Sequence, residues 1–300
     1  MEQQACILMN VNVAFAKLIH KIQPSSSEIT RANLHRSLIR QRLLRSFKLI
    51  KVFPIGSHSR KSAIRYFSDV DLVAVFSRKE AKWGDTYISS SRFLDNIRDD
   101  LLERFWQTDI SRDKQAVVVY FADGEHSVDV VPAIFRGIND GKYPVFMIPD
   151  GSGDWMPASP EYHNKYIQAA DERSGGKLRR TAQLIKFWRE CRSPRIPLSS
   201  FHLEILLASS RKCEGIKSYS QCLHETFDLL VDRGCRAMRD PIGISGNIGA
   251  INSAAQLETA LEAVTYSLEH AKKAQHAKAL GKMDEACRQW NIVFNGELPL

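Results

Sequence analysis

The sequence lacks most of the features that mark secreted, membrane-bound or zinc-stabilised proteins. Its 6 cysteines form no C-x-x-C pair, and none stands at zinc-ligand spacing from a histidine. We therefore expect reduced, mostly buried thiols and no zinc site. No apolar run reaches the roughly 20 residues of a membrane span. The apolar stretch after Met1 has no basic residues before it, unlike a signal peptide. We expect a cytoplasmic protein with no membrane partner.

The composition is that of an ordinary globular protein. Of the 300 residues, 44% are hydrophobic, 25% charged and 9% aromatic, and no internal repeat or low-complexity tract interrupts them. This length suits two packed lobes or one large domain. The net charge of +8 favours anionic partners such as nucleotides, nucleic acid or anionic lipid, without choosing among them.

Strand patterns concentrate in the first half of the chain. Short runs rich in β-branched and aromatic residues predict strands over 48–55, 69–76, 116–121 and 127–134. Asp123-Gly124, between the last two runs, is typical of a hairpin turn.

Helical patterns dominate the second half. After a helix at about 5–22, Ser25 and Glu28 form a capping-box pattern that predicts the start of another. Further helices are expected at 86–107, 160–173, 177–191, 199–213, 219–237, 253–275 and 279–293. We therefore predict an α+β fold with a catalytic lobe in residues 1–155 and a helical lobe in residues 156–300. The active site should lie in the cleft between them, and the N-terminal helices could pack on both lobes.

Three aspartates form the most informative pattern. Asp69 and Asp71 point to the same side of the second predicted strand, because side chains alternate along a strand. Asp129 lies on a later strand, and if the two strands are neighbours the three carboxylates converge on one spot. Such anions are tolerable only with bound cations. Carboxylate oxygens suit Mg²⁺ or Mn²⁺, and two ions could activate an attacking hydroxyl and neutralise leaving pyrophosphate.

A Gly-Ser turn precedes these acids. Gly56 lets the backbone approach a phosphate closely, and Ser57 can donate both its N–H and its hydroxyl. An Asp-x-Asp pair or a Gly-Ser pair alone is common, and coincidence remains the structural alternative. Together they predict metal-dependent transfer of nucleotides.

The same residues resemble the DNA polymerase β-type nucleotidyltransferase superfamily. The order of motifs is a Gly-Ser turn, Asp-x-Asp on a strand and a later acid. Within the superfamily, residues 56–65, 68–71 and 128–133 are similar to the bacterial CD-NTases, relatives of cyclic GMP-AMP synthase and oligoadenylate synthase. The likeness continues through residues 155–163, 184–188, 196–204, 240–248 and 288–296. It implies a polymerase β-like lobe with a mixed sheet, followed by a helical nucleotide-binding lobe.

The resemblance also implies roles in the helical half. Lys186 and Ser200 would grip the donor triphosphate, and Phe201 would stack on a base. The residues alone leave other interpretations open. Lys186 lies beside an apolar stripe and could snorkel. Ser200 could be only a helix N-cap, and Phe201 could belong to the core.

Three residues near the Gly-Ser turn also have open roles. His58 could be exposed and irrelevant to function. Arg60 could contact phosphate or pair with an acid, and Arg65 could pair with the aspartates that follow it.

The resemblance implies a synthase that makes a cyclic di- or oligonucleotide second messenger from nucleoside triphosphates, with two Mg²⁺ ions that Mn²⁺ could replace. Anti-phage signalling in the bacterial cytoplasm is implied, with an effector that binds the product rather than this protein. The alternatives are a related transferase acting on RNA, a small molecule or a protein, and a non-catalytic nucleotide- or RNA-binding relative. Because the zinc-bound insertion of DNA-sensing relatives has no counterpart, we expect no DNA requirement. The arginine-rich second helix leaves RNA binding open.

Overall fold

The computed structural model describes residues 10–121 and 127–300 and divides into two compact units. The sheet unit comprises Pro24–Gln168 and Ile242–Gly246. The helical unit comprises Met1–Gln23, Ala169–Pro241 and Asn247–Leu300. These units interleave along the chain, whereas the sequence pattern suggested one boundary after residue 155. That boundary, as a division between functional domains, stays a prediction.

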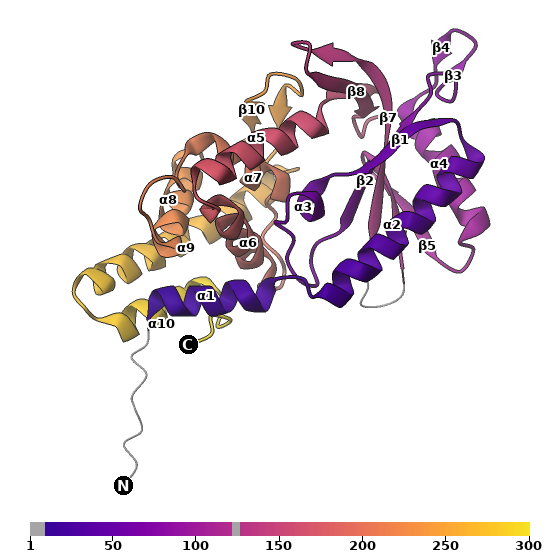
Figure 1. Ribbon diagram of the computed structural model, residues 1–300. Helices are drawn as coiled ribbons and strands as arrows, with labels where there is room; N and C mark the ends of the chain where they lie inside the picture. The colour runs from indigo at the N-terminus through magenta and orange to yellow at the C-terminus, as the bar shows by residue number, and fades with distance from the viewer. Residues whose placement is uncertain (1–9, 122–126) are drawn as a thin grey trace. The chain divides into compact units, whose positions relative to one another are not determined.

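A mixed sheet forms the centre of the sheet unit (Figure 1). Its order is β1-β2-β7-β6-β5, with β8 pairing β7 and β9. The bounds are β1 Leu49–Pro54, β2 Val70–Phe76, β5 Asp109–Asp113, β6 Ala116–Tyr120, β7 Val128–Asn139, β8 Tyr143–Pro149 and β9 Trp155–Ala158. β2 and β7 run parallel, and the other neighbours run antiparallel. The predicted mixed sheet and α+β class are confirmed.

The predicted strands correspond to β1, β2, β6 and β7. The sequence pattern missed β5, β8, β9 and the extension of β7 to Asn139, as well as the short hairpin of β3 Lys82–Trp83 and β4 Thr86–Tyr87. The predicted Asp123-Gly124 turn lies outside the described residues.

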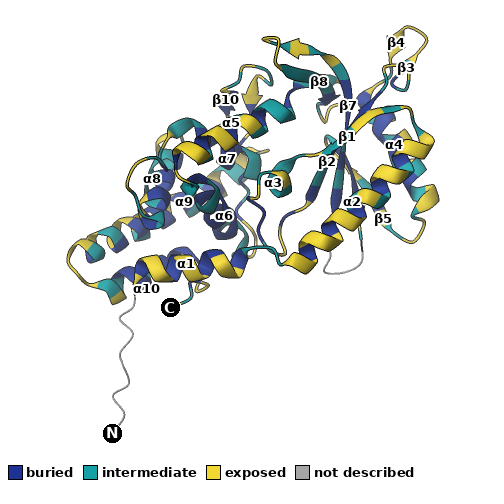
Figure 2. Ribbon diagram, viewed as in Figure 1, coloured by how far each residue is buried: buried dark blue, intermediate teal, exposed yellow. Residues whose placement is uncertain are grey.

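Two helices pack with the sheet around a shared apolar core: α2 Ser26–Ser46 and α4 Ser90–Arg104. The predicted capping box at Ser25 and Glu28 begins α2. α4 begins later than the pattern suggested, because the Ser89 side chain caps it by accepting from the N–H of Arg92. Figure 2 shows the buried strands beside these helices, whose outer faces are exposed.

The central strands β2 and β6 bury both of their faces along most of their length. Leu72 and Val130 belong to the core cluster shared with α2 and α4, while Val73 and Ala133 join Phe146 in a second cluster. Adjacent residues therefore enter different layers, as alternation along a strand requires. Every residue of β2 is buried except the half-buried Asp71. The carboxylate of Asp71 therefore lies near the start of a strand whose other residues are all buried.

The helical unit contains α1 Val11–Ile22, α6 Lys177–Glu190, α7 Ser200–Ser210, α8 Tyr219–Asp232, α9 Ala254–Ala279 and α10 Met283–Val293. α5 Pro160–Arg173 begins in the sheet unit and ends in this one. α1 packs against α6, α8 and α10. Its Phe15 meets Trp290 and Phe294 edge to face. Short strands β10 Met238–Arg239 and β11 Asn247–Ile248 form a separate pair.

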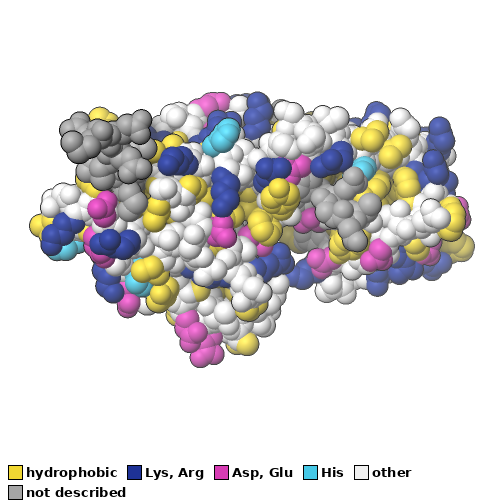
Figure 3. All heavy atoms as spheres, turned by 90° about the horizontal axis from the view of Figure 1, so that it is seen from below, with side chains coloured by type: hydrophobic (Ala, Val, Ile, Leu, Met, Phe, Trp, Pro, Cys, Tyr) yellow, Lys and Arg dark blue, Asp and Glu magenta, His cyan; other side chains and the backbone are white. Residues whose placement is uncertain are grey.

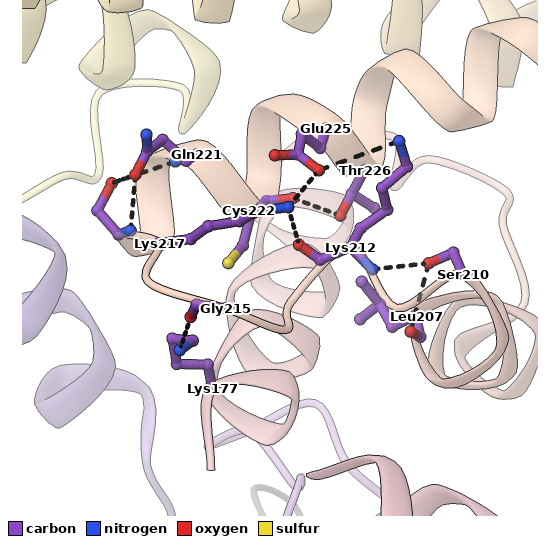
Figure 4. Close-up of polar contacts among 11 residues, drawn as sticks. Lys177, Leu207, Ser210, Lys212, Gly215, Lys217, Gln221, Cys222, Glu225 and Thr226 are labelled. Atoms are coloured by element: carbon purple, nitrogen blue, oxygen red, sulfur yellow. Dashed lines mark hydrogen bonds and ion pairs between the residues drawn. The ribbon is translucent and has the colours of Figure 1, made fainter. Parts of the chain in front are cut away.

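The connection between α7 and α8 is held by lysines (Figure 4). The Lys217 ammonium donates to the carbonyl of Lys212 at 3.2 Å and to Glu225 Oε2 at 2.7 Å. Lys177 donates to the carbonyl of Gly215 at 2.6 Å. Cys222 lies in this region and, with the other described cysteines, is a free thiol. These cations stabilise a loop rather than form a separate basic patch.

None of the helices in the described part of the chain is long and apolar enough to cross a bilayer. On the face drawn in Figure 3, Lys and Arg side chains are interspersed with Asp and Glu. The excess of positive charge is therefore mixed with negative charge on that face.

Candidate active site

The parallel pairing of β2 with β7 aligns the predicted metal-binding aspartates. Asp71 is the register partner of Asp129, and Val70 is the partner of Val128. Asp69 and Ser127 are the residues just before these two strands, and the N–H of Val70 donates to the carbonyl of Ser127 at 2.9 Å. The condition for a shared acidic site, that the two strands are neighbours, is therefore met.

Asp129 is the carboxylate most affected by these surroundings. Burial, followed by the charges of Asp69, Asp71 and Asp113, raises its pKa from 3.8 to about 8. Its Oδ1 is buried and has no hydrogen-bond partner among the described residues. A buried, unsatisfied carboxylate oxygen beside further acids favours a nearby cation. An all-oxygen donor set of this kind fits a hard divalent ion such as Mg²⁺ or Mn²⁺.

The side chains of Asp69 and Asp71 contact different neighbours. Within residues 10–121 and 127–300, no group of three or more His, Cys, Asp and Glu side chains is gathered so that it could hold a metal ion. Asp69 Oδ1 accepts a hydrogen bond from Ser127 Oγ at 2.5 Å. The Asp71 carboxylate lies against Gly56. The backbone register thus meets the condition for convergence, and the binding of a metal ion by the three carboxylates stays a prediction.

Gly56 begins the one-turn helix α3, Gly56–Ser59, and is required there for two reasons. Its φ of +68° lies in the left-handed region. A Cβ on this residue would lie 1.7 Å from Asp71 Oδ2. The N–H of Ile55 also donates to the carbonyl of Asp71 at 3.0 Å. The Gly-Ser turn is thus built directly onto the strand that carries the acid.

The loop between the turn and the aspartates is tied internally. The carbonyl of Ser57 accepts from the N–H of Ser62 at 2.9 Å. Ser68 Oγ accepts from the N–H of Ile64 at 2.8 Å. His58 is half-buried, with Nε2 3.3 Å from the carbonyl of Ser68. The interpretation of His58 as exposed is therefore wrong.

The two arginines near the turn reach other elements of the sheet unit. Arg60 Nη1 donates to Asn164 Oδ1 at 2.8 Å. Arg65 Nε lies 3.1 Å from Glu28 Oε2, in the first turn of α2. The ion pair of Arg65 is therefore with Glu28 and not with the aspartates that follow it.

In the helical unit, Lys186 on α6 is buried and forms an ion pair with Glu204 on α7. It does not reach to the surface as a snorkelling lysine would. Glu204 was not singled out in the sequence, although an acid between Leu203 and Ile205 in a fully buried stretch is a usable signal.

Ser200 and Phe201 begin the same α7 helix. Ser199, not Ser200, is the N-cap, with its Oγ accepting from the N–H of His202 at 3.3 Å. The N-cap interpretation of Ser200 is therefore wrong. Phe201 is half-buried, whereas residues 202–208 are buried, so it is not a plain core residue. Lys186, Ser200 and Phe201 belong to the helical unit and the aspartates to the sheet unit. A site built from both sets stays a prediction.

Comparison with known proteins identifies the family. Residues 9–171, more than half of the chain, match the family described as Second Messenger Oligonucleotide or Dinucleotide Synthetase domain, SMODS. The chain belongs to the SMODS family. The predicted membership of the bacterial CD-NTases and of the nucleotidyltransferase enzymes is confirmed.

Individual relatives agree with this assignment. A probable cyclic nucleotide synthase of Bacillus cereus is 24% identical over 275 residues, which cover 83% of this chain and 82% of that protein. Among solved structures, Escherichia coli MS115-1 CdnC in a complex with HORMA-deltaN has a TM-score of 0.73 at 18% identity, covering 98% of both chains. Vibrio cholerae DncV, a cyclic AMP-GMP synthase bound to a linear intermediate, has a TM-score of 0.75 at 12% identity, covering 98% of this chain and 97% of that one. At these identities the two structures show the fold alone.

Ser127, which contacts Asp69 directly, lies outside the Gly-Ser, Asp-x-Asp and third-acid motifs from which the site was predicted. Its sequence signal is weak but usable. A serine two positions before the third acid shares that acid's face of the strand. Because Val70 pairs with Val128, this serine also lies beside the residue preceding β2.

Proposed function

We propose that this SMODS protein condenses ribonucleoside triphosphates into a cyclic di- or oligonucleotide through Asp69, Asp71 and Asp129. One observation carries the assignment. The parallel register pairs Asp71 with Asp129, and the same Asp71 packs against the Gly56 turn. The acids proposed to bind a cation and the turn proposed to bind phosphate are therefore in contact within the sheet unit.

Asp69, Asp71 and Asp129 would hold divalent ions, two Mg²⁺ by preference and Mn²⁺ as a substitute. When bound, such ions lower the pKa of an attacking hydroxyl and neutralise charge on leaving pyrophosphate. The buried Oδ1 of Asp129, unpartnered within the described residues, supports this assignment. So does its raised pKa, because a bound cation would stabilise the ionised carboxylate.

Residues of the protein would bind the donor triphosphate and assist proton transfer. The backbone at Gly56 and the N–H and hydroxyl of Ser57 would hold the donor triphosphate. Asp129, ionised when a cation is bound, would lie beside the ion that activates the ribose hydroxyl and could help to accept its proton. The hydroxyl oxygen would then bond to the α-phosphorus as the bond to pyrophosphate breaks. Repetition of the step on the linear product would close the ring.

Lys186, Ser200 and Phe201 would complete nucleotide binding. The half-buried positions of Ser200 and Phe201 at the start of α7 leave part of each side chain accessible to a ligand. Lys186 would contribute its charge while held by Glu204. Phe201 offers an aromatic face for a base.

The relatives named as cyclic nucleotide synthases support a cyclic product for this chain as well. The biological setting we propose is second-messenger signalling against phage in the bacterial cytoplasm. An effector would bind the product rather than the synthase.

The test is incubation with all four ribonucleoside triphosphates and Mg²⁺ or Mn²⁺, then phosphatase treatment and mass spectrometry. A phosphatase-resistant cyclic product is expected, and Asp71→Asn should abolish it. Asp109→Asn, an exposed acid on β5, is the matched control and should retain activity. Only linear, phosphatase-sensitive products would contradict cyclisation, and full activity of Asp71→Asn would contradict the assigned site.

A further inference from the structure

Ser127 makes a short side-chain hydrogen bond to one of the proposed metal-binding aspartates, Asp69. Its Oγ donates to Asp69 Oδ1 at 2.5 Å. This hydrogen bond occupies one oxygen of the carboxylate and leaves Oδ2 outside it. The arrangement is the one expected of a group that orients a metal ligand, since ligating carboxylates are themselves hydrogen-bonded by neighbouring residues.

The backbone fixes where Ser127 stands. It precedes β7 as Asp69 precedes β2, and the next residues, Val128 and Val70, are register partners. The carbonyl of Ser127 also accepts from the N–H of Val70 at 2.9 Å. Ser127 is only 9% exposed, whereas Asp69 is exposed. A buried donor at the start of β7 therefore contacts an exposed carboxylate.

The exposed position of Asp69 makes this restraint useful. An aspartate has two side-chain torsions, and its terminal torsion is broad. An ionised Asp129 would also repel this carboxylate, which favours rotation toward solvent. A short hydrogen bond to a charged acceptor is stronger than a neutral one and can hold one rotamer. Ser127 thus opposes the rotation that would remove Asp69 from the acidic site.

We infer that Ser127 is a positioning residue that holds Asp69 ready to bind a divalent cation with its second oxygen. This role rests on the proposed function, because it assumes that Asp69 is a metal ligand. It adds a residue outside the Asp-x-Asp and third-acid pattern, and it makes cation affinity depend on a hydroxyl that touches neither ion nor nucleotide.

The experiment measures Mn²⁺ affinity by electron paramagnetic resonance of free Mn²⁺, with the unreactive α,β-methylene analogue of ATP present and no turnover. Ser127→Ala should weaken Mn²⁺ binding about tenfold or more, as loss of such a hydrogen bond does elsewhere. Ser127→Cys, which keeps the size but is a weak donor, should also weaken it. Ser127→Thr keeps the hydroxyl on an extended backbone and should retain near wild-type affinity.

The matched control is Ser90→Ala. Ser90 is a buried serine of the same unit whose Oγ has no hydrogen-bond partner among the described residues. Its substitution should leave Mn²⁺ affinity unchanged. Urea unfolding of each variant checks that the fold is intact. Wild-type affinity in folded Ser127→Ala, or equal losses in Ser127→Thr and Ser127→Ala, would overturn the inference.

Asp69→Asn separates this inference from the proposed function. If Asp69→Asn loses Mn²⁺ binding while Ser127→Ala does not, the positioning role alone is wrong. If Asp69→Asn binds Mn²⁺ as the wild type does, the metal assignment of the proposed function is wrong, and the role of Ser127 falls with it.

Discussion

Lys186 on α6 and Glu204 on α7 form an ion pair inside the helical unit, with side-chain exposures of 3% and 1%. Both charges have left water, so each needs the other to offset its lost hydration. The pair therefore joins two helices and also fixes the lysine that we propose for triphosphate binding.

Replacing one residue of this ion pair should destabilise the protein much more than replacing both. We expect Lys186→Met or Glu204→Gln to lower the free energy of unfolding by about 3 kcal/mol, because each leaves one buried charge without the opposite charge of its ion pair. Lys186→Met combined with Glu204→Leu should recover most of the loss, and urea unfolding would measure it. The exposed pair of Lys21 and Glu297 is the control. Lys21→Met should change stability by less than about 1 kcal/mol.

The double variant should differ from the wild type in nucleotide affinity even though its stability is largely restored. The double variant should regain stability without regaining affinity for a triphosphate, because the ammonium is gone. Titration with an unreactive ATP analogue would measure this. Wild-type affinity in the stable double variant would show that Lys186 is a structural residue only.

Gly56→Ala should disable the site through Asp71. The new Cβ would meet the Asp71 carboxylate at 1.7 Å and would require the left-handed backbone. We expect turnover to fall about 100-fold, since a displacement of 1 Å at a reacting centre has an effect of that size. Gly137→Ala is the control, because a Cβ there meets nothing within 4 Å and its φ is not positive. Equal activities of the two variants would contradict the contact.

Asp129 should make the metal-free protein less stable as the pH rises. Its pKa is raised from 3.8 to about 8, so between these values the folded state holds a proton that the unfolded state has lost. Stability from this group is fully present below pH 4 and is lost as the pH approaches 8, at about 1 kcal/mol per pH unit.

Urea unfolding in EDTA from pH 5 to 8 would measure this dependence. Asp129→Asn does not titrate and should lose that part of the slope, while the contributions of other groups remain. Identical slopes for the two proteins would mean that Asp129 ionises normally.

Phe201 should contribute its aromatic face rather than its bulk. Phe201→Ala should raise the KM for a triphosphate about tenfold, because stacking of a base on a ring contributes about 1–3 kcal/mol. Phe201→Tyr should remain near wild type, since the ring is kept. Phe201→Leu is the decisive comparison, because it keeps apolar volume without a ring. A Leu variant as good as the Tyr variant would indicate packing instead of stacking.

The elements that were predicted and missed differ in their physical signal. β2 and β6 are near-continuous apolar runs rich in valine, and their pattern is local. β5, Asp109–Asp113, carries mostly polar residues because it lies at the end of the sheet order. Such an edge strand is defined by its partner rather than by its own hydrophobicity.

The residues of the site also divide into those with a local sequence signal and those defined by a distant partner. Asp69, Asp71, Asp129, Gly56 and Ser57 were chosen from residue type and spacing, because hard-cation ligands and a glycine turn have few substitutes. Spacing along the chain could not predict that Ser127 would contact Asp69, or that Glu204 would pair with Lys186. These partners are 58 and 18 residues apart.

The amino-acid sequence by itself determined which residues could bind a cation or a phosphate, and on which strands and helices they lie, because side-chain chemistry and local periodicity are properties of short segments. Only the tertiary structure decided that β2 runs beside β7 in a register that pairs Asp71 with Asp129. It also decided that Asp69 and Asp71 turn to different neighbours, and that Lys186 is buried with a partner. Register and burial depend on contacts between distant segments, which a local pattern does not contain.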